Sequence, residues 1–148
     1  MELTLPLDSQ AIESILPHRY PFLLVDRIDA LDLDRRIVGV KNVSENEPYL
    51  WRDPAGRSVL PPTLLTEAIA QVGAILILAK PDNRQRIPLF AGIKRVRYRK
   101  PVYAGDVVEI EAVVIRLRST MGLLKGIARV NGERVVDGTM AFALGDKQ

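Results

Sequence analysis

The sequence contains no cysteine. This absence excludes a disulfide framework, metal sites built from thiolates and catalysis by a cysteine nucleophile. Residues 1–8 (MELTLPLD) lack the basic start and apolar stretch of a secretory signal, so we expect a cytoplasmic protein. Long apolar runs are missing too. The clearest one, residues 72–79, is too short to span a membrane, and we expect no membrane partner.

Acidic side chains are absent from residues 94–100 (KRVRYRK), where part of the net charge of +3 is concentrated. Such a run favours an acidic partner, or protects an exposed strand edge by its charge. Only Tyr98 could stack on a base and no nucleic-acid motif accompanies it, so we expect no nucleic acid binding. The residues expected to contact an acidic partner are Lys94, Arg95, Arg97, Arg99 and Lys100.

The 148 residues are 47% hydrophobic and 26% charged, which predicts one compact domain over residues 1–148. A short helix is expected over residues 8–16, capped by Asp8 or Ser9. Residues 22–28 and 36–43 are rich in β-branched side chains and predict an antiparallel strand pair. Residues 44–62 contain several prolines and a glycine, which predict a long loop of the kind that often carries function.

Residues 63–80 predict a helix that is apolar nearly all round. Thr63, Glu67 and Gln71 form its one polar stripe, at i, i+4 and i+8. Four further strands are expected over residues 88–99, 106–118, 122–131 and 134–144, with Asn131 and Gly132 as a hairpin turn. Because such a helix must be enclosed, we expect an α+β hotdog fold, in which a curved antiparallel sheet wraps around one long central helix.

Three segments carry a resemblance to a known family. They are LPHRYPFLLVDR (residues 16–27), NEPY (46–49) continued by LP (60–61) and EAIAQ (67–71), and AGIKRVRYRKPV (91–102) with GD (105–106), KG (125–126) and MAFAL (140–144). In order and spacing they resemble the β-hydroxyacyl-acyl-carrier-protein dehydratases. The resemblance implies a hotdog fold, an acyl thioester on acyl carrier protein as substrate and partner, and neither a cofactor nor a metal. It also implies a site built across a dimer, with the loop residue from one chain and the helix acid from the other.

Dehydration needs a base for the proton beside the carbonyl and an acid for the leaving oxygen. In the family the base is a loop histidine fourteen residues before the helix acid. Counting back fourteen from Glu67 reaches Asp53. A glycine N–H at the helix start also serves the family as an oxyanion donor, and Pro62, which has no N–H, stands at that position. The only histidine, His18, matches a structural histidine of the signature, so we expect it to be a hydrogen-bonded core or surface residue.

We therefore expect a dehydratase-like protein that binds β-hydroxyacyl or enoyl thioesters with impaired or absent activity. The alternatives are an acyl thioesterase that uses Asp53 or Glu67, and an active dehydratase that uses these two carboxylates as a pair. A homodimer, a larger assembly of dimers or a heterodimer with an active homologue would form the site. The residues expected to line a tunnel for the acyl chain are Phe22, Trp51, Leu64, Ile69, Gln71 and Val72, with Trp51 near its mouth.

Overall fold

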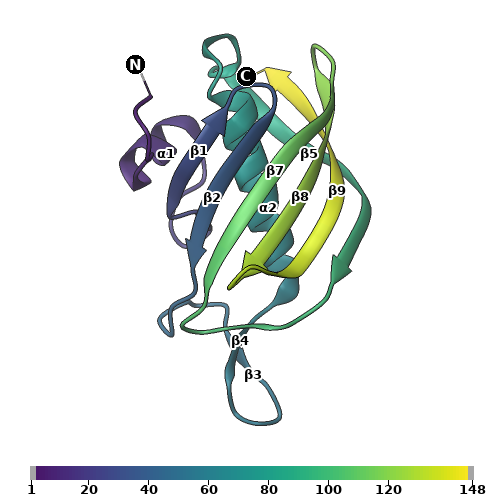
Figure 1. Ribbon diagram of the computed structural model, residues 1–148. Coiled ribbons are helices and arrows are strands. Elements are labelled where there is room, and N and C mark those ends of the chain that lie inside the picture. Colours follow the sequence, from purple (N-terminus) through teal and green to yellow (C-terminus); the bar gives the residue numbers. More distant parts are fainter. Residues whose placement is uncertain (1–2, 147–148) are drawn as a thin grey trace.

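The computed structural model describes residues 3–146. One long helix, α2, lies against a curved antiparallel sheet, and a small hairpin extends from one end of the molecule (Figure 1). The elements in chain order are α1 (Ser9–Ile15), β1 (Arg27–Asp32), β2 (Arg36–Asn42), β3 (Trp51–Arg52), β4 (Ser58–Leu60), α2 (Pro62–Leu78), the 3-10 turn η1 (Pro81–Asn83), β5 (Arg86–Tyr98), β6 (Val102–Tyr103), β7 (Val107–Leu117), β8 (Met121–Val130) and β9 (Glu133–Asp146).

The main sheet has the strand order β1-β2-β7-β8-β9-β5, and every neighbouring pair is antiparallel. Helix α2 contacts β2, β7, β8, β9 and β5, so the sheet encloses it along most of its width. This is the expected hotdog arrangement. A second sheet, β3-β4-β6, lies apart from the first.

Helix α2 is the centre of the hydrophobic core because it carries apolar side chains on nearly every face. Pro62 occupies its first turn, where a missing N–H breaks no helical hydrogen bond. Glycine allows the closest approach of the helix to the sheet. A Cβ added at Gly126 of β8 would lie 2.1 Å from Cγ2 of Ile69. The absence of a side chain at Gly126 therefore allows the short distance between α2 and the sheet.

Most of the predicted elements are confirmed. Asp8 caps α1 by accepting a hydrogen bond from the N–H of Ala11 at 2.9 Å. Asn131 and Gly132 have φ values of 50° and 81°, the left-handed pair that a tight two-residue hairpin turn requires. The central helix spans residues 62–78, close to the predicted 63–80.

Two predictions about local structure were wrong. The strand expected over residues 22–28 begins only at Arg27, because the backbone of residues 22–24 bonds to the side chain of Gln71 in place of a neighbouring strand. The loop expected over residues 44–62 contains the hairpin of β3 and β4. Its strands are so short that their sequence carries no alternation.

Strand β5 forms one edge of the main sheet. It pairs with β9 on one side, and within residues 3–146 no strand pairs with its other side. Leu89, Phe90 and Ile93 are exposed apolar side chains along it. A free edge of this length is a surface on which a second chain can add a strand.

Candidate active site

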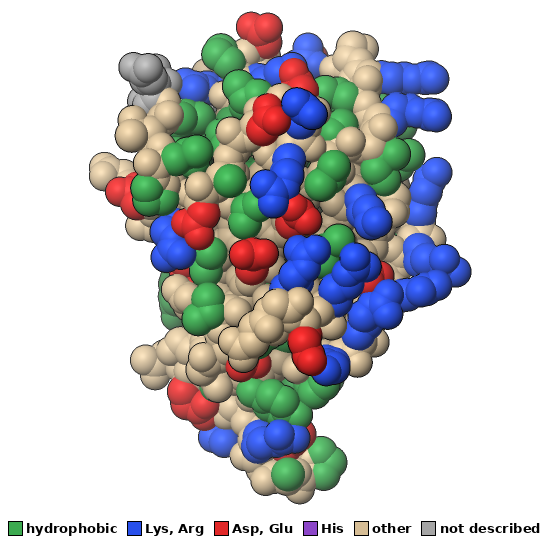
Figure 2. Space-filling model, viewed as in Figure 1, with side chains coloured by type: hydrophobic (Ala, Val, Ile, Leu, Met, Phe, Trp, Pro, Cys, Tyr) green, Lys and Arg blue, Asp and Glu red, His purple; other side chains and the backbone are tan. Residues whose placement is uncertain are grey.

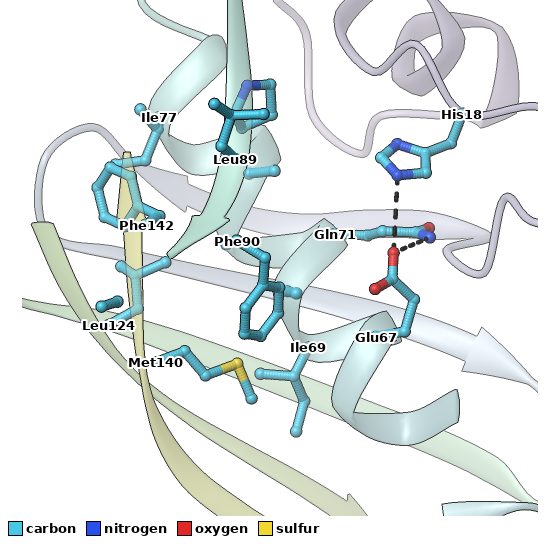
Figure 3. A pocket seen from close by; sticks show the side chains of 15 residues that line it. His18, Glu67, Ile69, Gln71, Ile77, Leu89, Phe90, Leu124, Met140 and Phe142 are labelled. Atoms are coloured by element: carbon cyan, nitrogen blue, oxygen red, sulfur yellow. Dashed lines mark hydrogen bonds and ion pairs between the residues drawn. The ribbon is translucent and has the colours of Figure 1, made fainter. Parts of the chain in front are cut away.

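A cavity of about 250 Å³ lies between α2 and the strands β5, β8 and β9. Its wall is mostly apolar, and three polar residues from α2 and the segment before β1 interrupt it at one end (Figure 3). The three are His18, Glu67 and Gln71. The apolar side chains include Ile69, Ile77, Leu89, Phe90, Met140 and Phe142. An apolar space with a few convergent polar groups is typical of a binding site for a largely apolar small molecule.

Glu67 and Gln71 lie one turn apart on α2, as the polar stripe predicted. The Gln71 side chain donates from Nε2 to Glu67 Oε1 at 2.9 Å and to the carbonyl oxygen of Phe22 at 2.8 Å. Its Oε1 accepts from the N–H of Leu24 at 2.9 Å. These bonds fix the amide orientation and hold one Glu67 oxygen in place. The other, Oε2, has no hydrogen-bond partner in the part of the chain described here.

His18 lies in the same cavity and faces the same carboxylate. Its Nε2 is 3.6 Å from Glu67 Oε1, and the imidazole points at the carboxylate (Figure 3). Nδ1 is buried without a hydrogen-bond partner among residues 3–146. We expected a structural histidine held by hydrogen bonds, and the structure instead brings this ring to the candidate acid. The sequence pattern could not predict this contact, because 49 residues separate His18 from Glu67.

Asp53 lies in the turn between β3 and β4 and does not line the cavity. Its side chain accepts hydrogen bonds from Arg57, at 2.9 Å from the backbone N–H and at 3.0 Å from Nε. The Arg57 guanidinium lies 4.1 Å from the Tyr103 ring centre and donates to the Tyr103 hydroxyl. The backbone hydrogen bond from Arg57, followed by the bond and charge of its side chain, lowers the pKa of Asp53 despite partial desolvation. Within one chain, therefore, Asp53 is ionised and its side chain stabilises the turn between β3 and β4.

The rest of the hairpin is also held by polar contacts. Arg52 donates to Glu45 Oε1 at 3.2 Å and to the carbonyl oxygen of Gly56 at 3.1 Å. Ser58 donates to the same Glu45 carboxylate. In the segment before the hairpin, the buried Lys41 Nζ pairs with Oε1 of the largely buried Glu47 at 2.7 Å. The hairpin is thus a defined projection from the end of the sheet (Figure 1).

Four of the residues expected to bind substrate do not line the cavity within one chain. Val72 is fully buried against Gly39 of β2. Leu64 is half-buried in the first turn of α2, and Phe22 is 40% exposed. Trp51 is exposed on β3. Of the expected set, Ile69 and Gln71 line the cavity. A role of all six in binding stays a prediction.

The basic residues predicted to contact an acidic partner lie at and just beyond the end of β5. Arg99 pairs with Asp137 at 2.7 Å, and Lys100 pairs with Glu133. The other three, Lys94, Arg95 and Arg97, are exposed and form no ion pair with any residue from 3 to 146. Lys and Arg side chains gather on the side of the molecule where β9 and β5 lie (right in Figure 2).

Among residues 3–146 no group of three or more His, Asp or Glu side chains is arranged to hold a metal ion. Within the same range no helix has the length and apolar content needed to cross a membrane.

Comparison with known proteins places this chain in a family. Residues 16–139 match the model of the FabA-like domain. The chain is 48% identical over 141 residues to the 3-hydroxyacyl-[acyl-carrier-protein] dehydratase FabZ of Geobacillus thermodenitrificans, which covers 95% of this chain and 97% of that one. It is 46% identical over 140 residues to FabZ of Bacillus subtilis, covering 95% of this chain and 99% of that one.

A solved structure shows the same fold at lower identity. The dehydratase heterocomplex ApeI:P from Xenorhabdus doucetiae superposes with a TM-score of 0.80 at 20% identity, covering 98% of this chain and 94% of that one. The full-length similarity and the domain match confirm the resemblance found in the sequence. The chain therefore belongs to the FabA-like hotdog family, among the relatives of the FabZ-type 3-hydroxyacyl-[acyl-carrier-protein] dehydratases.

Proposed function

We propose that this chain binds β-hydroxyacyl and enoyl thioesters of acyl carrier protein in the cavity beside Glu67, and that it interconverts them at a reduced rate. The observation that carries the proposal is the position of Glu67. Its carboxyl lies at the polar end of an apolar cavity, with one oxygen fixed by Gln71 and the other without a hydrogen-bond partner among residues 3–146. A carboxylic acid so placed can donate a proton to the leaving hydroxyl group.

We infer that the rate is reduced because Asp53 stands where the family carries its reactive histidine. A carboxylate whose pKa is lowered by Arg57 is a weaker base than an imidazole, whose pKa lies near neutrality. Pro62 supports the same inference. It begins α2 at the position of the family's N–H donor, and it has no N–H to offer a developing enolate oxygen.

A fully active dehydratase is the second candidate, and the similarity to relatives named as dehydratases favours it over an inactive chain. In a dimer the hairpin of one chain would bring Asp53 to Glu67 of the other. Two carboxylates that approach closely share a proton, and such a pair can act as acid and base. This candidate requires Asp53 to leave its bonds with Arg57.

The proposed partner is acyl carrier protein, and the proposed assembly is a dimer formed through the free edge of β5. Lys94, Arg95 and Arg97 are the basic side chains left available for an acidic partner, while Arg99 and Lys100 already have carboxylate partners. A second copy would extend the sheet and cover the exposed apolar side chains of β5. The second subunit could instead be a homologue that keeps the loop histidine, which would give a heterodimer. A cytoplasmic location remains the expectation.

One assay on a single substrate separates these functions. Crotonyl thioester on acyl carrier protein is incubated with the purified protein, and hydration, free carrier thiol and binding are measured in parallel. We expect binding with slow hydration and no thiol release. Rapid thiol release would identify a thioesterase, and the absence of both binding and hydration would contradict the proposal.

A further inference from the structure

The cavity contains an imidazole and a carboxyl group from the same chain. His18 Nε2 and Glu67 Oε1 are 3.6 Å apart, and each side chain is 26% exposed. They are the only ionisable residues among the described ones that line the cavity. All of its other walls are apolar or amide. Any proton transfer inside this cavity by one chain alone must therefore use these two groups.

The segment that carries His18 is fixed on both sides. On one side Arg19 donates to the carbonyl oxygens of Leu16 at 2.8 Å and Glu13 at 3.1 Å, which ties the segment to the end of α1. On the other side Gln71 bonds to the backbone of residues 22–24 and to Glu67. The same amide thus positions the carboxyl and anchors the segment of the imidazole. Such double anchoring is what a preorganised acid and base pair requires.

We propose that His18 and Glu67 of a single chain form the acid and base pair that acts on the thioester. The proposal rests on the function proposed above. In dehydration, neutral His18 takes the C2 proton at Nε2, and the C–H electron pair forms the C2–C3 double bond. The C3–O bond breaks, and protonated Glu67 gives its proton to the departing hydroxyl, which leaves as water. Transfer of one proton from His18 to Glu67 then restores both groups.

The geometry suits this division of roles. Dehydration takes a proton from C2 and gives a proton to the hydroxyl oxygen on the adjacent C3, and the two side chains lie close together at the same end of the cavity (Figure 3). With its proton on the buried Nδ1, the imidazole presents its Nε2 lone pair to the cavity. Asp53, in contrast, is ionised, bonded to Arg57 and outside the cavity of its own chain.

The test is hydration of crotonyl thioester on acyl carrier protein by the wild-type protein and by His18→Gln. Glutamine can still reach Glu67 with its amide but cannot accept the proton, so a merely structural role of His18 would survive the change. We expect kcat to fall about a hundredfold or more, in keeping with the usual contribution of a general base. Binding of the thioester should change less than about threefold, as expected when an interaction acts only in the transition state. Tyr20→Phe, an exposed neighbour in the same segment, is the matched control and should keep the wild-type rate.

The pH profile gives a second readout. If His18 is the base, the wild-type dehydration rate should fall on the acid side of the pH profile, and His18→Gln should lack this fall. Wild-type rates in both His18→Gln and His18→Asn would overturn the proposal, as would a large loss in Asp53→Asn without one in His18→Gln. A wild type that binds but never hydrates would also overturn it while leaving acyl binding intact. Absence of binding would contradict the proposed function itself.

Discussion

Because Asp53 and Pro62 stand where the family has a histidine and a glycine, replacing them with these residues should raise dehydratase activity. Asp53→His supplies a second imidazole in the hairpin, and Pro62→Gly supplies an N–H at the first turn of α2. An oxyanion donor of this kind contributes about 3 kcal/mol to the transition state, roughly a hundredfold in rate. The base and the donor act on one transition state, so Asp53→His alone should recover little activity and the double variant should recover far more.

The structure also sets the side effects of these changes. Asp53→His removes the carboxylate that accepts both the backbone N–H and the side chain of Arg57, so the turn should loosen. Pro62→Gly replaces a residue that suits the first helical turn by one that lowers helix stability by about 1 kcal/mol. Thermal unfolding of each variant therefore accompanies the rate measurement.

The assay is hydration of crotonyl thioester by the wild type, Asp53→His, Pro62→Gly and the double variant. Equal rates in the single variant Asp53→His and in the double variant would show that no donor is missing at Pro62. A wild type that turns over rapidly, and loses that rate in Asp53→Asn, would refute the reasoning, because the carboxylate would then be the catalyst.

Three further predictions concern the scaffold. Gly126→Ala would place a methyl group 2.1 Å from Cγ2 of Ile69. We expect this overpacking to lower the free energy of unfolding, measured by urea denaturation, by about 1–3 kcal/mol. Unchanged stability would show that α2 can shift. Burial opposes ionisation of Glu111, but the hydrogen bond and charge of Arg36 hold its pKa below the usual value. The stabilising effect of ionised Glu111 is therefore present above about pH 4.3 and is lost as pH falls through its folded pKa. We expect Glu111→Gln to lower the free energy of unfolding at pH 7 and to lower it less at pH 3. An equal loss of stability at both pH values would contradict this. Ile93→Lys on the free edge of β5 should weaken self-association in light scattering, and an unaltered mass would place the interface elsewhere.

The sequence predicted the scaffold well because local patterns determine it. An apolar run with one polar stripe predicts a buried helix, and Glu67 and Gln71 of that stripe both line the cavity. The Asn131 and Gly132 pair predicted a tight turn because few residues adopt its left-handed geometry.

What the sequence could not predict depends on contacts between distant segments. Gln71 bonds to the backbone of residues 22–24 and so helps to hold the segment that brings His18 to Glu67, and neither His18 nor Glu67 carries a local sign of their contact. One signal was present, since His18 is the only imidazole and lies in a segment that resembles the dehydratases. The hairpin was missed because strands of two and three residues are too short for a pattern.

The most direct test of the account is the dehydration of 3-hydroxybutyryl thioester on acyl carrier protein, followed by mass spectrometry. We predict that the wild type removes one water from the intact acyl carrier protein adduct, and that Glu67→Gln binds the adduct without this loss. Dehydration that persists in Glu67→Gln, or release of free carrier by the wild type, would contradict the central role assigned to Glu67.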